Sequence, residues 1–237
     1  MHEKKMKITE YIKKTRNTLQ EKKETLFYNR INVFVKDPLP EGVFLQNVLK
    51  KVESIVPNHL VTNVDVLYVG HFKFMDKYDL NAMYKDQALY ISNDQDDEED
   101  MIDDIIHELA HSIEEKNWSE IYGDEKLEKE FLGKRKKLYQ LLSAHDYSVE
   151  LKQFMNPEYD LDFDEKMYKE IGYDKLEHFS MSLFISPYGI TSLKEYFGSG
   201  FEHFFIGDKK SLTKVSPVLY NKIAALVEKG EHLDETW

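Results

Sequence analysis

Residues 98–113 read Glu-Glu-Asp-Met-Ile-Asp-Asp-Ile-Ile-His-Glu-Leu-Ala-His-Ser-Ile, and the rest of the chain is expected to pack around them. Apolar side chains recur here at helical spacing, which predicts a helix with one buried face. These are Ile102, Ile105, Ile106, Leu109 and Ile113. Six carboxylates within residues 94–100 come just before, where negative charge stabilises a helix N-terminus. The acidic run lacks the glycine and ligand spacing of a calcium loop, so we interpret it as N-terminal helix charge.

Two histidines of this helix are candidate metal ligands. His107 and His111 lie four residues apart, so their imidazoles share one face and can reach the same metal ion. With Glu108 they form the pattern H-E-x-x-H, the signature of zinc peptidases, in which the carboxylate takes a proton from a zinc-activated water. We therefore expect Zn²⁺ at the two histidines and Glu108 as the general base. The alternative is two incidental histidines on an amphipathic helix.

A catalytic zinc also needs a third protein ligand. The longer pattern H-E-x-x-H-x-x-G-x-x-H fails, because Glu114 and Asn117 stand where glycine and histidine are required. A glutamate from a later helix is then the natural expectation. The candidates are Glu177, Glu195 and Glu202, with His178 and His203 as second-choice nitrogen donors. His178 lies in an apolar segment, so we expect it to be a hydrogen-bonded core histidine.

Residues 188–197, Tyr-Gly-Ile-Thr-Ser-Leu-Lys-Glu-Tyr-Phe, resemble the second motif of the anthrax lethal factor catalytic domain and of the bacterial Pro-Pro endopeptidases. In those families a tyrosine precedes the glutamate zinc ligand by seven residues, a threonine follows that tyrosine by three, and two aromatics follow the glutamate. The resemblance implies a zincin-like metallopeptidase fold in which Glu195 completes the zinc site. It also implies that the Tyr188 hydroxyl stabilises the oxyanion, a role that suits a phenol donor. Residues 188–205 further resemble metallopeptidase-like proteins of bacterial viruses.

The chain departs from that motif pattern in two places. The separation of His111 and Glu195 is longer than in those families, so residues 124–170 are expected to form an insertion. Where those families carry Ala-Glu-Ala after the aromatics, this chain has residues 198–200, Gly-Ser-Gly.

The downstream residues also have ordinary structural interpretations. Ser192 and Glu195 have the spacing of a capping box, in which the carboxylate returns to the helix N-terminus. With Thr191 as the cap instead, Glu195 is free to point elsewhere. Tyr188 can be one of fifteen structural tyrosines. In the central helix, Asp103 and Asp104 can orient an imidazole or lie on a solvated face, and we favour the solvated face.

Hydrophobic periodicity and turn residues predict an α+β fold, with a small mixed β-sheet, the H-E-x-x-H helix and a mostly helical C-terminal half. Before the central helix we expect a helix over 5–26, a strand over 31–35, a helix over 44–55 ended by Pro57, a strand over 64–69, and a hairpin of 81–84 and 88–92. After it we expect helices over 124–143 and 173–185, one from Thr191 or Ser192, and one from Pro217 to Gly230, with 144–170 irregular or in short helices. We interpret 1–237 as a single domain. Its sheet subdomain is 1–116, and its helical subdomain, 117–237, carries the third ligand.

Composition limits the compartment and the partners. A net charge of −12 over 237 residues argues against nucleic acid or an anionic membrane as the main partner. Without cysteine the chain has neither disulfides nor thiolate zinc ligands. The charged first residues and the lack of a long apolar run indicate no signal peptide or transmembrane segment. A cytoplasmic or virion-associated protein is expected.

The sequence therefore predicts a zinc-dependent endopeptidase that acts on a protein or peptide substrate. An extended substrate would add to the edge of the 81–92 hairpin, with Tyr84 and Tyr90 lining side-chain pockets or serving as ordinary half-buried strand aromatics. One rival is a catalytically idle zinc protein with a structural or interaction role, for example in a phage particle. The other is a helical binding module without metal.

Overall fold

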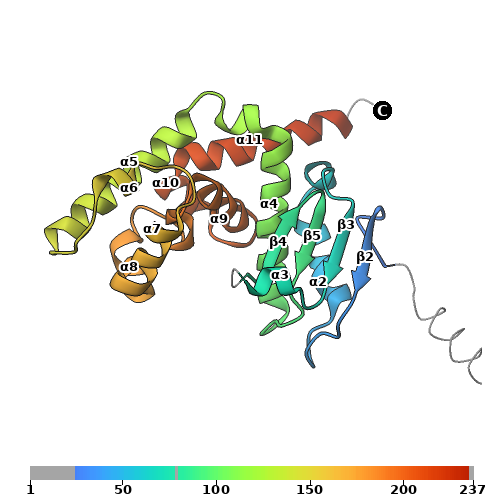
Figure 1. Cartoon of the computed structure of the whole chain (residues 1–237). Coiled ribbons are helices and arrows are strands. Elements are labelled where there is room, and N and C mark those ends of the chain that lie inside the picture. The colour runs from blue at the N-terminus through green and yellow to red at the C-terminus, as the bar shows by residue number, and fades with distance from the viewer. Residues whose placement is uncertain (1–24, 78–79, 235–237) are drawn as a thin grey trace, which may run out of the picture.

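A five-stranded mixed sheet forms one half of the protein (Figure 1). The computed structural model describes residues 25–77 and 80–234. The strands are β1 (Thr25–Phe27), β2 (Ile31–Val35), β3 (Val66–Val69), β4 (Ala82–Lys85) and β5 (Ala88–Ile91), in the spatial order β1-β2-β3-β5-β4. β2, β3 and β5 are parallel, whereas the edge strands β1 and β4 are antiparallel to their neighbours. The helix-rich C-terminal half and this sheet confirm the α+β prediction.

Helices make up most of the remaining structure. They are α2 (Leu45–Ile55), η1 (Asn58–Val61), α3 (Lys73–Asp76), α4 (Glu98–Tyr122), α5 (Lys126–Ala144), α6 (Leu151–Phe154), α7 (Leu161–Lys166), η2 (Met167–Ile171), α8 (Tyr173–Ser180), η3 (Tyr188–Ile190), α9 (Leu193–Ile206), α10 (Lys209–Val215) and α11 (Pro217–Asp234). Helices α2 and α4 lie behind the sheet in Figure 1, while α5 to α11 form the helical half beside it. No helix of the described ranges is both long and apolar enough to cross a membrane.

Strand alternation places the core on the helix side of the sheet. Leu67, Leu89 and Ile91 are fully buried, because every second residue of a strand points to the same face. The opposite face carries Tyr68 and Tyr90, whose rings stack at 5.3 Å between centroids. Tyr90 is thus a half-buried aromatic on the outer face of the inner strand β5, the ordinary one of the two interpretations that the sequence left open.

The hairpin of β4 and β5 is formed as predicted. Asp86 and Gln87 have φ values of 51° and 62°, the left-handed backbone of a two-residue turn that matches strand twist. β4 is left as the outer strand beside α4. The hairpin therefore brings an edge strand of the sheet next to the helix that contains the two histidines.

Helix α4 forms where its sequence predicts it. The Asp97 side chain accepts hydrogen bonds from the backbone N–H groups of Glu99 and Asp100, which caps the N-terminus. The five apolar residues of the predicted stripe are all buried, at 8 % exposure or less. The helix continues past 116 to Tyr122, with a kink at Asn117.

Several predicted element boundaries are wrong. Most of the helix predicted over 5–26 lies outside the described residues, but its last part is in strand β1. The helix predicted over 173–185 ends at Ser180, and the last helix runs past Gly230 to Asp234. His178 is exposed on α8 and is not a core histidine.

Candidate metal centre

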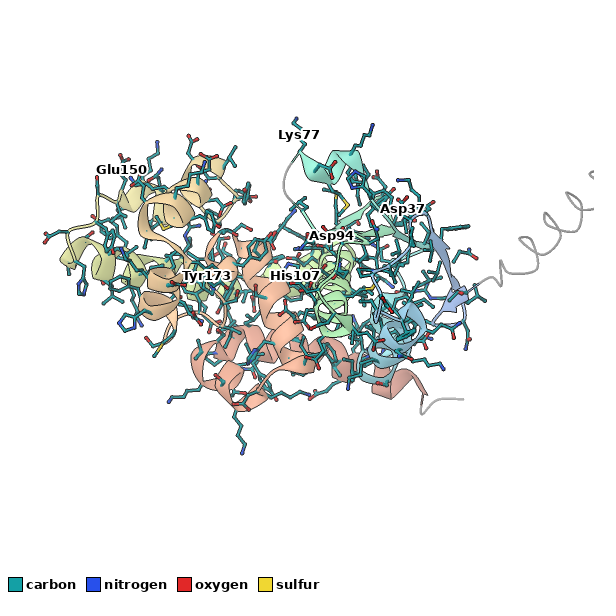
Figure 2. The ribbon with its side chains drawn as sticks, turned by 90° about the horizontal axis from the view of Figure 1, so that it is seen from below. Asp37, Lys77, Asp94, His107, Glu150 and Tyr173 are labelled. Atoms are coloured by element: carbon teal, nitrogen blue, oxygen red, sulfur yellow. The ribbon has the colours of Figure 1, made fainter. Side chains whose placement is uncertain are left out.

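The two imidazoles of α4 converge on one carboxylate of α9. Nε2 of His107 lies 2.9 Å from Oε2 of Glu195, and Nε2 of His111 lies 3.5 Å from the same oxygen. One ligand atom from each residue lies within 4.8 Å of the others, and this is the metal-competent group of three found among the described residues. Figure 2 shows His107 where the sheet half meets the helical half. The predicted ligand set is thus brought together from segments 88 residues apart.

Helix α9 presents Glu195 from its first turn. Ser192 is the N-cap, and its hydroxyl accepts a hydrogen bond from the Glu195 backbone N–H at 3.1 Å. The Glu195 side chain does not return to the helix N-terminus as a capping box would require, because its carboxylate lies between the two imidazoles. Ser192, not Thr191, is therefore the cap, and Glu195 is available as a ligand nonetheless.

Close packing of α4 against α9 depends on Gly198. A Cβ atom at this position would lie 2.8 Å from Cε1 and Nε2 of the His107 ring, closer than side chains normally approach. The glycine therefore lets the α9 backbone reach the ring. Residues 198–200, the Gly-Ser-Gly that departs from the resembled families, are fully packed inside the protein.

Carboxylates hold the outer nitrogen of each imidazole. Nδ1 of His107 lies 3.3 Å from Glu202, and Nδ1 of His111 lies 2.7 Å from Glu114, whose other oxygen accepts a hydrogen bond from the Tyr122 hydroxyl. An Nδ1–H that donates to a carboxylate leaves Nε2 with the lone pair that a metal requires. Both Nε2 atoms face Glu195, so neutral imidazoles protonated on Nδ1 would direct two lone pairs to that point.

Without a cation the site is an ion-paired cluster. Burial opposes charge on His107, but the carboxylates of Glu195 and Glu202 outweigh burial and raise the imidazole pKa to about 9. Burial likewise opposes charge on Glu195, yet the two imidazoles hold its pKa well below the ordinary value. The arrangement therefore keeps Glu195 anionic beside two nitrogens, and a bound cation would replace the imidazole protons as its partner.

Glu108 and Tyr188 flank the three ligands. Glu108 is 8 % exposed and accepts a hydrogen bond from the backbone N–H of Tyr84 in β4. Burial raises the pKa of its carboxyl, the direction that favours a proton acceptor at neutral pH. The ring of Tyr188 lies 5.7 Å from that of His107, and 43 % of the residue is exposed.

The other candidate residues considered from the sequence lie outside the group of three converging ligands. Glu202 orients His107 and is not one of the three converging ligands. Glu177 and His178 are exposed on α8. Asp104 accepts a hydrogen bond from Gln95 at 3.0 Å, while its neighbour Asp103 is half-buried. The histidines are thus oriented by Glu202 and Glu114 instead of Asp103 or Asp104.

Three contributors to the site were missed in the sequence: Glu114, Tyr122 and Gly198. The spacing of three from His111 to Glu114 was the available signal, because residues three apart share a helix face. The role of Gly198 has no local signal, since it depends on how α9 meets α4.

Comparisons with family models, curated proteins and solved structures find no match to this chain.

Proposed function

We propose that this protein is a zinc-dependent endopeptidase. The observation that carries the proposal is the convergence of His107, His111 and Glu195, with Glu108 and Tyr188 at its border. Supporting it are the H-E-x-x-H pattern and the resemblance of residues 188–197 to the second motif of lethal factor-like peptidases. On this proposal the fold is zincin-like.

The donor set suits zinc. Two imidazole nitrogens and one carboxylate oxygen are the ligands of many catalytic zinc sites, which leave a fourth position open. Ligands about 2.0–2.2 Å from a tetrahedral zinc lie roughly 3.3 Å from one another. The separations of 2.9 and 3.5 Å from Glu195 to the two Nε2 atoms bracket that value. When bound, zinc would polarise the scissile carbonyl and lower the pKa of the attacking water.

The protein's own side chains would provide proton transfer, stabilisation of the oxyanion and orientation of the metal ligands. Glu108 accepts the proton of the attacking water and delivers it to the amine that leaves, so one carboxylate serves as base and then as acid. Tyr188 donates its hydroxyl hydrogen to the oxygen that gains charge as water adds to the peptide. His107 and His111 keep their orientation through the carboxylates at their Nδ1 atoms.

The outer edge of β4 is the proposed site of substrate binding. Tyr84 lies opposite Leu89, and its backbone N–H points away from β5 to the Glu108 carboxylate. The outer edge of the sheet therefore lies directly beside the proposed general base. An extended peptide that adds to this edge by backbone hydrogen bonds would place its carbonyl groups beside the metal centre.

A peptide library read by mass spectrometry tests the activity. Zinc-loaded wild-type protein should cleave a subset of peptides, and Glu108→Gln should retain zinc but lose about 10²–10⁴-fold in rate. Glu99→Gln, an exposed change on the same helix, is the matched control and should cleave normally. A zinc-loaded wild type that cleaves no peptide would favour the idle structural or interaction role. If the protein bound no zinc, the remaining interpretation would be a helical binding module without metal.

A further inference from the structure

We propose that helix α5 positions the third metal ligand, through Arg135 and Lys134. The proposal rests on the metal centre described above and gives a role to residues 124–170. Neither side chain touches Glu195. Lys134 contacts a neighbour of Glu195 in the first turn of α9, and Arg135 holds the segment to which that turn is hydrogen-bonded.

Arg135 is held inside the helical half. It is 1 % exposed, and its guanidinium carbon lies 4.0 Å from the centroid of the Phe163 ring. Two of its nitrogens donate to the backbone carbonyls of Gln153, at 2.8 Å, and Asn156, at 2.7 Å. Because guanidinium is planar and forked, it can fix both carbonyls at once.

The segment that Arg135 holds continues directly to α9. The carbonyl of Pro157, one residue after Asn156, accepts a hydrogen bond of 2.8 Å from the backbone N–H of Leu193. This N–H is among the first of the helix and has no partner within it. Arg135 thus fixes the place where α9 begins, two residues before Glu195.

Lys134 reaches the residue that follows Glu195. Its Nζ donates to the Tyr196 hydroxyl at 2.5 Å and to Ser216 Oγ at 2.6 Å. The Tyr196 hydroxyl in turn donates to Glu130 of α5 at 2.9 Å. Tyr196 is 2 % exposed, so this chain of hydrogen bonds is shielded from water and strengthened by burial.

The two connections lie on either side of Glu195. A helix anchored at Leu193 and at Tyr196 can neither slide nor rotate without breaking buried hydrogen bonds. Metal coordination tolerates only about 0.2 Å of displacement in ligand distances, so a small shift of this turn is enough to weaken binding. The insertion between the histidines and Glu195 thus supports the ligand that follows it.

A double-mutant cycle on zinc affinity tests the positioning role. Zinc dissociation constants are measured by competition with a chromophoric chelator for Arg135→Lys and Tyr196→Phe, each in the wild-type and the Glu195→Ala background. Both changes are conservative, and thermal unfolding in chelator shows whether each variant is folded. Tyr139→Phe, which removes a hydroxyl of α5 outside this chain of hydrogen bonds, is the control.

We expect each change to weaken zinc binding about tenfold or more when Glu195 is present, as for other groups that orient metal ligands. In the Glu195→Ala background the same change should alter affinity less than twofold, because no ligand is left to position. Equal losses in both backgrounds, or no loss in either, would overturn the positioning role while the metal centre stands. A wild-type chain that fails to bind zinc would refute both proposals.

Discussion

The backbone of α9 approaches the His107 ring because residue 198 carries no side chain. This is a residue-scale requirement of the candidate metal centre, since two of its proposed ligands come from α4 and one from α9. A methyl group at 198 meets ring atoms at 2.8 Å, and the ring belongs to a proposed ligand. Either the helices separate or the imidazole turns away from Glu195.

We predict that Gly198→Ala destabilises the protein by about 1–3 kcal/mol through overpacking and lowers zinc affinity. Gly133→Ala is a matched control, because an added Cβ at this exposed position of α5 meets no atom within 4 Å. It should stabilise the protein by about 0.4–1 kcal/mol. Chemical denaturation with chelator, followed by zinc titration, measures both effects. A Gly198→Ala variant with wild-type zinc affinity would disprove the close approach.

Glu114 is the second residue with a specific prediction. Its carboxylate accepts from the Nδ1 of His111 and from the Tyr122 hydroxyl, and it is 3 % exposed. We expect Glu114→Gln to lower zinc affinity about 10–100-fold, because a neutral amide orients and polarises the imidazole less well. Chelator competition measures the change, with Glu99→Gln as the exposed control. Unchanged affinity would show that His111 does not need this partner.

At the scale of elements, α4 was predictable because its determinants are local. The Asp97 cap and the apolar stripe lie within a few residues of one another, and both can be identified without knowledge of any tertiary contact. The turn of the β4–β5 hairpin was predictable for the same reason. The pairing of His107 and His111 followed from helix geometry alone.

Elements that depend on distant contacts were not predictable. Gly230 had the position of a helix end, yet it lies within α11 against His59, and a Cβ there would stand 2.1 Å from the Nδ1 of that ring. Its lack of a side chain serves close packing instead of helix termination. Likewise α8 ends at Ser180, whose carbonyl accepts from the N–H groups of Leu183 and Phe184 as the chain turns and buries Phe184.

The burial of Lys134 on α5 makes stability depend on pH. Burial opposes its charge and lowers the pKa of its amine from 10.5 to about 8, although nearby Glu130 favours the charged form. Between about pH 8 and 10.5 the unfolded chain therefore binds this proton more strongly than the folded protein does. The Lys134 contribution to unfolding free energy should rise across that window, by up to about 1.4 kcal/mol per pH unit.

Urea denaturation of metal-free protein at pH 8, 9 and 10 checks this prediction. The difference in unfolding free energy between wild type and Lys134→Met isolates the lysine, and it should shift in favour of the wild type as pH rises. A difference that stays constant over this range would show that the amine titrates normally.

At the scale of the whole molecule, the candidate metal centre lies where the two halves of the chain meet. α4 brings two of the proposed ligands from beside the sheet, and α9 brings the third from the helical half (Figures 1 and 2). A second link is the carbonyl of Leu226 in α11, which lies 3.1 Å from Nε2 of His59. The sequence predicted Glu195 from its motif, but only the packing of α9 on α4 shows that the carboxylate reaches both imidazoles.

An anomalous difference map collected at the zinc absorption edge, from crystals of protein purified without chelator, tests the central claim most directly. The account predicts one strong peak about 2.0–2.2 Å from Nε2 of His107, Nε2 of His111 and a carboxylate oxygen of Glu195. The same map from Glu195→Ala crystals should show a weaker peak. A wild-type map without a peak at these three atoms, or with the metal bound elsewhere, would contradict it.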